Sequence, residues 1–199
     1  MAGAEGIARM LEAVRMGGPE ELREACAEIV RSWRDAPVKD LLALKEQFRK
    51  MDMEERESVL DEALISVAEK RPGPFTEIVR DPEAPLWRPA AEVLSGARDP
   101  RHLELFVSLL PACPRKSVET LIRAVGRYRD PVALAAVKEY LHDADEGVML
   151  EAVMAVREAG GSEGVGYLRE ALENARRGSA GNVPVLEGVI REMERKSEA

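Results

Sequence analysis

Histidine, cysteine and clustered acidic residues are the side chains of this sequence that could do chemistry, and they are few. His102 and His142 are its two histidines, and Cys26 and Cys113 are its two cysteines. The cysteines lie far apart, with no CxxC pair and no histidine cluster beside them, so their spacing predicts neither a disulfide framework nor a zinc site. We expect both to be buried thiols. His142 falls near the end of a predicted helix, where the helix dipole favours a cation.

An acidic stretch, "HDADEG" from His142, resembles the start of a calcium-binding loop. An EF-hand requires acidic or amide side chains at positions 1, 3 and 5, glycine at about position 6 and glutamate at about position 12. Counting from Asp143 puts Gly147 at position 5 and Met154 at position 12, so the match fails. We expect a solvated turn, with Asp145 or Glu146 near a helix start.

The glycine-rich stretch "GGSEGVG" at 160–166 resembles a phosphate-binding loop only in composition. No Lys-Ser or Lys-Thr follows it and no strand is expected before it. We expect a turn. Gly164 and Gly166 then lie inside a predicted helix, and the sequence gives no reason for glycine at these two positions. No serine or cysteine has an obvious histidine and carboxylate beside it. The sequence therefore predicts no catalytic residues, no metal site and no cofactor, and we expect the protein not to be an enzyme.

The elements that must carry these residues are predicted to be helices. Of the 199 residues, 45% are hydrophobic and only 4% are aromatic, which favours a core of closely packed aliphatic helices over a sheet. The formal net charge of −8 disfavours nonspecific binding to nucleic acid or to an anionic membrane. No apolar run is long enough to span a membrane, and the N-terminus lacks a signal-peptide pattern, so we expect a cytoplasmic protein.

A spacing of 31 residues recurs along the chain. "SGARDPRHLELFVSLLP" from Ser95 and "GRYRDPVALAAVKEYLHD" from Gly126 align with Asp99-Pro100 on Asp130-Pro131, and a third row follows without a gap through 86–172. The aligned apolar columns are Leu94, Val125, Val156; Leu103, Leu134, Val165; Phe106, Val137, Leu168; and Leu110, Leu141, Leu172. Such repetition indicates stacked equivalent units.

Each row predicts two helices. Val118, Leu121, Ile122 and Val125 have the i, i+3, i+4, i+7 spacing of an amphipathic helix, and the second half of the row has the same spacing. The Asp-Pro pairs are helix start signals, because Asp can accept bonds from free N–H groups and Pro suits the first helical position. In the third row Gly160-Gly161-Ser162 takes their place.

The rest of the chain is predicted to continue the pattern more loosely as one domain, 1–199, with diverged repeats over 1–85. Further helices are expected over about 4–16, 19–33, 38–50, 54–69 and 183–196, and a flexible loop over 174–184. We therefore expect an all-α fold, an α-solenoid of about six stacked antiparallel helix pairs.

The stretch "DPVALAAVKEYLHDADEGVMLEAVMAVREAG" resembles HEAT repeats, particularly the short bacterial kind named after phycobilisome lyases. The resemblance covers 86–172 well and implies a scaffold. One feature departs from the family pattern, which usually has a Val-Arg pair at the start of the second helix, with the Arg linked to turn carboxylates. Here the nearest column holds Trp87, Val118 and Met149, so this charge ladder is expected to be missing. These side chains either fill the core or form an apolar seam for a partner.

The resemblance implies that the second helix of each pair lines a concave side, where a partner would bind. Its flank holds two i, i+4 charge pairs and then an apolar pair. The candidate partner-binding residues are Arg88, Glu92, Glu119, Arg123, Arg127, Leu150, Met154 and Arg157. Leu150 and Met154 either cover the helix over 162–176 or form an adaptable apolar interface.

The function expected from these features is a noncatalytic scaffold or adaptor, which binds another protein or is a subunit of a larger complex. Its partner and its oligomeric state are left open. One alternative, implied by the family name alone, is a lyase-like or chaperone-like helper of a chromophore or cofactor protein. The other is a nucleic-acid-binding protein. The local basic run at Arg115, Lys116, Arg123, Arg127 and Arg129 favours it, but the column Asp61, Glu92, Arg123 and Met154 is not a basic stripe.

Overall fold

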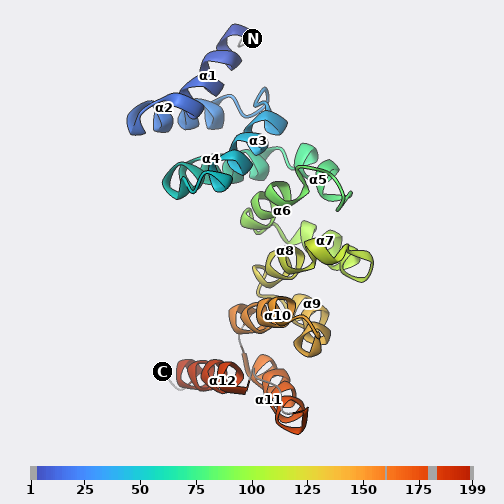
Figure 1. Cartoon of the computed structure of the whole chain (residues 1–199). Helices are drawn as coiled ribbons and strands as arrows, with labels where there is room; N and C mark the ends of the chain where they lie inside the picture. Colours follow the sequence, from blue (N-terminus) through green and yellow to red (C-terminus); the bar gives the residue numbers. More distant parts are fainter. Residues whose placement is uncertain (1–3, 160, 179–182, 198–199) are drawn as a thin grey trace. The chain divides into compact units, whose positions relative to one another are not determined.

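The computed structural model describes residues 4–159, 161–178 and 183–197, and within them the chain forms helices and turns with no strand (Figure 1). The all-α prediction is confirmed. The chain divides into two compact units, Met1–Asp99 (unit 1) and Pro100–Ala199 (unit 2), and each is described by itself.

Unit 1 consists of helices joined by short turns. Its helices are α1 (Ala4–Met16), α2 (Pro19–Arg31), α3 (Val38–Lys50), α4 (Glu54–Lys70), α5 (Gly73–Val79) and α6 (Trp87–Gly96). Within this unit α2 packs on both α1 and α4, α3 packs on α4, and α6 packs on α4 and α5. The starts of the first four helices agree with those predicted from the sequence.

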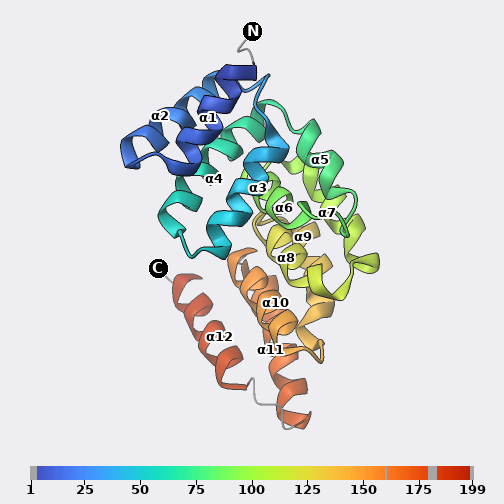
Figure 2. The same ribbon diagram turned by 45° about the horizontal axis from the view of Figure 1, so that its top comes forward.

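Unit 2 combines α-helices with single 3-10 turns. Its elements are η1 (Pro100–His102), α7 (Leu103–Leu109), η2 (Leu110–Ala112), α8 (Arg115–Gly126), α9 (Pro131–Val137), η3 (Lys138–His142), α10 (Glu146–Ala159), α11 (Gly161–Gly178) and α12 (Val183–Ser197). Here α10 packs on α8, α9, α11 and α12, and Figure 2 shows α12 alongside α10 and α11. The loop predicted over 174–184 is helical at both ends, and 179–182 lie outside the described residues.

The Asp-Pro pairs begin helical segments as the sequence predicts. Asp130 adopts an extended conformation, its side chain accepts a hydrogen bond from the Val132 N–H at 2.8 Å, and Pro131 follows at the first helical position. After Asp99, the chain first makes the 3-10 turn η1 and only then the α-helix α7. The segments predicted as single helices around Phe106 and Val137 each end in such a 3-10 turn, which tightens their last residues.

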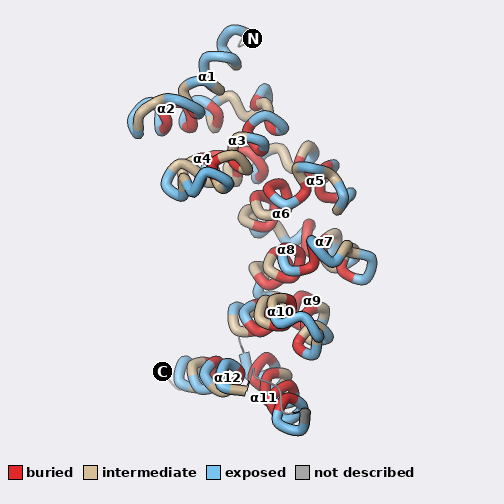
Figure 3. The backbone as a smooth tube through the Cα atoms, in the orientation of Figure 1, coloured by how far each residue is buried: buried red, intermediate tan, exposed pale blue. Residues whose placement is uncertain are grey.

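The four apolar columns of the 31-residue repeat are buried in every row. Leu94, Phe106, Val125, Val137, Val156 and Leu168 are fully buried, and the other six side chains are nearly so. In Figure 3 the buried residues of α8 and α10 lie on the sides that face neighbouring helices. Burial thus follows the register that the sequence predicts.

Trp87, Val118 and Met149 form part of the core. Their exposed fractions are 2%, 5% and 4%, and the Trp87 indole N–H donates to the Val79 carbonyl oxygen at 2.9 Å. The interpretation of this column as an apolar seam for a partner is therefore wrong, because the chain itself already covers these side chains. Cys26 is buried as predicted, but Cys113 is only half-buried.

Two glycines mark close approaches between helices of unit 2. A Cβ on Gly126, at the end of α8, would lie 2.6 Å from the Ala155 Cβ on α10, so a side chain would push these helices apart. A Cβ on Gly164 would lie 3.2 Å from a Val156 methyl and 3.4 Å from the Met193 Cε, which gives this helical glycine a packing role. A Cβ on Gly166 would meet nothing within 4 Å.

Candidate partner-binding surface

Arg88 and Glu92, the candidate residues of unit 1, form the predicted i, i+4 ion pair on α6. The Arg88 Nε donates to a Glu92 carboxylate oxygen at 3.2 Å. Glu92 is only 13% exposed, however, and it also accepts two bonds from one guanidinium nitrogen of Arg49 on α3, at 2.9 and 3.0 Å. Its carboxylate is thus committed within unit 1, and only Arg88 is at the surface.

Glu92 belongs to a buried ion cluster around Lys45, which was not predicted from the sequence. The Lys45 side chain on α3 is 4% exposed, and its ammonium nitrogen lies 2.8 Å from a Glu57 oxygen, 3.4 Å from Asp61 and 3.4 Å from Glu92. Burial alone would lower the pKa of Lys45, but these carboxylates, Asp61 first among them, outweigh burial and raise it. Burial would raise the pKa of Glu92, but the cations around it, with Lys45 first, lower it.

The sequence contains a signal for this cluster. Lys45 lies seven residues after Val38 and three before Phe48, within the apolar stripe of α3 that also includes Leu41 and Leu42. A lysine at a core position is almost never fully buried unless carboxylates pair with it. The stripe therefore indicates a buried cation, although it does not indicate which helices supply the carboxylates.

In unit 2, Arg123 reaches from α8 across to α10. Its Nε donates to a Glu151 carboxylate oxygen at 3.1 Å, and a second guanidinium nitrogen contacts the other oxygen, which makes a bidentate pair. The Arg123 side chain is 42% exposed. Glu119 is exposed over the first turn of α10, and Arg127 is half-buried. The local spacing predicted Glu119 as the partner of Arg123 and gave no indication of Glu151.

One charge link joins the start of α8 to the turn before α10. Arg115, at the start of α8, binds Asp143 through both guanidinium nitrogens, one of them at 2.7 Å, and approaches Asp145 at 3.5 Å. The hydrogen bonds from Arg115 lower the pKa of Asp143 to about 2. Arg115 lies three residues before the column that the resemblance indicated, and Ala84 and Glu146 stand at the equivalent positions of the other rows, so the absence of a repeated charge ladder stays a prediction.

The "HDADEG" turn organises the start of α10, as predicted. Asp143 accepts from the Asp145 backbone N–H at 2.8 Å, and Asp145 accepts from the Gly147 N–H at 3.0 Å. The second bond caps a free N–H group of the first turn of α10, and the first bond orders the turn before it. Among the described residues, no group of three or more His, Cys, Asp and Glu side chains is placed to hold a metal ion.

Met154 is the exposed apolar residue among the candidates, with 42% of its surface exposed, and Leu150 one turn earlier is half-buried. Met154 lines a hollow of about 540 Å³ on unit 2, together with Arg129, Arg157 and Glu158, and with Glu192 and Lys196 of α12. Glu192 accepts from the Lys196 ammonium group at 2.7 Å and lies 3.6 Å from an Arg157 nitrogen. The thioether therefore lies in a hollow bordered by paired charges.

The structure brings Glu119, Arg123, Leu150, Met154 and Arg157 together on the adjoining helices α8 and α10 of unit 2. Arg127 directly follows α8, whereas Arg88 and Glu92 belong to unit 1. We call Leu150, Met154 and Arg157, with Glu192 and Lys196, the Met154 surface. Among the helices that the structure describes, none is long and apolar enough to cross a membrane.

No protein-family model matches the chain, and no curated protein matches it. Among solved structures, the chain is similar to an engineered protein that was crystallised as a structural-genomics target. The two share 14% sequence identity over 96% of each chain, with a TM-score of 0.47.

Proposed function

We propose that the protein is a noncatalytic HEAT-like scaffold or adaptor, which binds another protein or joins a larger complex through the Met154 surface. The observation that carries this proposal is the exposure of Met154 beside a hollow on unit 2. An unbranched, polarizable side chain can adapt to differently shaped partners, and a border of charged pairs resembles the polar rim of protein interfaces.

The finer fold proposal is a solenoid of about six stacked helix pairs. It is supported by the equivalent burial of the apolar columns at 31-residue intervals and by the packing of α2 on α4 and of α8 on α10. In such a stack each unit covers the apolar stripe of the next, and the second helices form one continuous surface. The Met154 surface would lie on that side.

The paired arginines favour a protein partner over nucleic acid. Arg115 and Arg123 belong to the local basic run, and both are bound to carboxylates of unit 2. The phosphates of a nucleic acid would have to displace these carboxylates before they could pair with the two arginines. The helper role for a chromophore protein is still implied only by the family resemblance.

Affinity capture with three forms of the full chain tests the proposal. The wild type, Met154→Asp and Val132→Asp are used to isolate partners from native cell extract, and mass spectrometry identifies them. Val132 is 54% exposed on α9, away from the Met154 hollow, and is the matched control. We expect Met154→Asp to lose a protein that the wild type and Val132→Asp both retain, with unchanged circular dichroism. Retention of every partner by Met154→Asp would refute this surface.

A further inference from the structure

A second hollow lies on unit 1, along the contact between α2 and α4. A cavity of about 600 Å³ opens at the first turn of each helix, and one of about 270 Å³ continues along the same two helices. Arg23 and Val59 line both cavities, so the two form a single groove, which we call the α2–α4 groove. The groove belongs to unit 1 alone and shares no residue with the Met154 surface.

Apolar side chains from both helices line the floor of the α2–α4 groove, and Val30 and Val59 are the partly exposed ones. Leu22 and Val59 line its wider end, and Cys26, Val30 and Ala63 line the narrower one. These residues recur at helical spacing on both helices, so the apolar strip runs along the groove. Burial raises the pKa of the Cys26 thiol to about 11, which keeps it protonated and uncharged at neutral pH.

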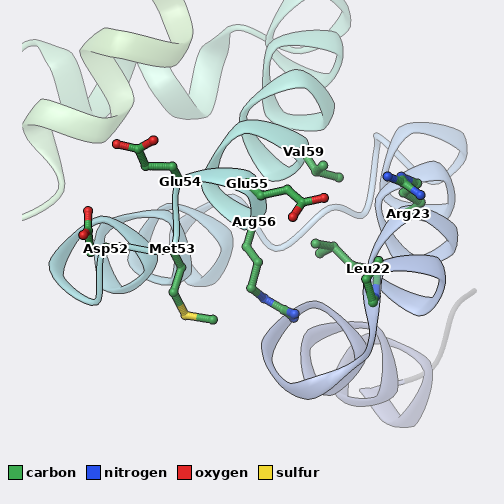
Figure 4. Close-up of a pocket in the computed structure, with 9 residues that line it drawn as sticks. Leu22, Arg23, Asp52, Met53, Glu54, Glu55, Arg56 and Val59 are labelled. Atoms are coloured by element: carbon green, nitrogen blue, oxygen red, sulfur yellow. The ribbon is translucent and has the colours of Figure 1, made fainter.

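The rim of the groove on the α4 side is acidic. Asp52, Glu54, Glu55 and Glu62 line it, and all four are exposed. Within the described part of the chain, none of these carboxylates has an ion-pair partner. In Figure 4 Glu55 and Val59 extend from α4 toward Leu22 and Arg23 on α2.

The two arginines of the groove do not neutralise this rim. Arg56 points away from it, because its guanidinium donates to the carbonyl oxygens of Val14 and Gly17 at 2.6 and 2.8 Å, at the end of α1 (Figure 4). The described lining residues thus include two arginines against four carboxylates, and the Arg56 guanidinium is held at the end of α1. The groove therefore combines an apolar floor with a net negative rim.

We propose that the α2–α4 groove binds a cationic amphipathic helix of a partner protein. Apolar side chains of that helix would pack over Val30 and Val59, which are half-buried, and its lysines or arginines would meet Glu55 and Glu62. Helix-in-groove recognition uses such a strip of apolar anchors, and opposite charges at the rim set orientation and specificity. The groove is a second binding surface, which goes beyond the proposed function and gives an adaptor two separate sites.

A synthetic helical peptide tests the groove on the full chain. The probe is a fluorescent peptide of about five helical turns, with leucine on one face and lysine on the other, and a second peptide carries glutamate in place of lysine. Binding is measured by fluorescence anisotropy at physiological salt. We expect the lysine peptide to bind the wild type. The double variant Glu55→Lys with Glu62→Lys should weaken its affinity at least about tenfold, because the peptide lysines would then face positive charges at the rim.

The matched control is Glu24→Lys with Glu69→Lys, which changes the net charge equally on the same two helices outside the groove. Both glutamates are exposed. We expect the affinity of this control for the lysine peptide to stay within about twofold of that of the wild type. Dissolved salt screens surface charges that lie away from the groove, so they have little effect on binding there. Hydrogen exchange should slow in α2 and α4 when the peptide binds.

The groove proposal is overturned if Glu24→Lys with Glu69→Lys weakens peptide binding as much as Glu55→Lys with Glu62→Lys. The peptide would then be attracted by the overall negative charge of the protein and not by the groove. It is also overturned if the glutamate peptide binds equally well, or if hydrogen exchange slows elsewhere and not in α2 or α4. Met154→Asp is expected to leave peptide binding unchanged. A failure of the groove and a failure of the Met154 surface are therefore separate results.

Discussion

In unit 1, Asp61 and Glu92 lie one repeat apart and both approach the buried ammonium group of Lys45, whereas Arg123 and Met154, the next positions of the same series, are at the surface of unit 2. The helical position is equivalent by sequence, but its burial differs. A buried cation of α3 requires the carboxylates of unit 1, and removal of one member of such a cluster is costly.

The comparison shows how a repeat can keep its core and vary its surface. The apolar columns, of which Leu94 lies in unit 1 and the other members in unit 2, are buried throughout, while the charged series between them changes partner from one helix to the next. In unit 2 the pair of Arg123 with Glu151 is partly solvated, so the free energy that it contributes to folding is small. We therefore expect side chains there to change with little loss of stability, which is compatible with the binding surface proposed above.

Two methionines of α10 give the largest expected difference within unit 2. Met149 is 4% exposed and Met154 is 42% exposed. We expect Met149→Ala to lower the free energy of unfolding by about 3 kcal/mol because it leaves a cavity, and Met154→Ala to change it by less than about 0.5 kcal/mol. Urea denaturation measures both. Equal losses would mean that Met154 is part of the core, and would remove the contrast between its position and those of Asp61 and Glu92.

Two glycines sharpen the comparison of packed and open positions. Gly126→Ala would place a Cβ 2.6 Å from that of Ala155, and we expect it to lower the free energy of unfolding by about 1–2 kcal/mol. Gly166→Ala meets nothing within 4 Å and should raise stability by about 0.5–1 kcal/mol, because alanine favours the helix. Chemical denaturation of both variants checks the sign. Stabilisation by Gly126→Ala would contradict the close approach of α8 and α10.

Breaking the exposed ion pair of Arg115 and Asp143 should have the smallest effect on stability, and that effect should depend on pH. The pKa of Asp143 is about 2 in the folded protein, below the ordinary value of 3.8, so its ionised form stabilises folding above about pH 3.8. That contribution is lost as the pH falls towards 2. We expect Arg115→Gln to lower the melting temperature slightly near neutral pH, with a difference that shrinks in acid.

The control for this pair is Arg80→Gln, which removes an exposed arginine of unit 1 that has no partner among the described residues. Its melting temperature should follow that of the wild type at every pH. A difference between wild type and Arg115→Gln that grows as the pH falls would contradict the assignment, because the sign of the linkage would be reversed.

The sequence predicts best what depends on local spacing. Helix starts, the apolar columns and the cap at Asp130 follow from short-range patterns, and the structure places them as expected. The prediction of six stacked pairs stays a proposal, because it concerns how units are arranged and not how each helix forms.

Local sequence patterns do not predict which side chains form ion pairs between different helices. Arg123 has Glu119 at the usual helical spacing, yet it binds Glu151 on the neighbouring helix. The carboxylates around Lys45 come from two other helices, α4 and α6, so only the place of Lys45 in an apolar stripe could have indicated a buried cation. Arg115 likewise binds a turn 28 residues later.

The free energies of unfolding of Lys45→Met and Arg123→Met, measured side by side by urea denaturation, test the contrast between the units most directly. Lys45→Met leaves three carboxylates without their buried cation, and we expect a loss of about 3–5 kcal/mol. Arg123→Met breaks a partly solvated pair, and we expect a loss below about 1 kcal/mol. Losses of equal size in the two variants would contradict the account.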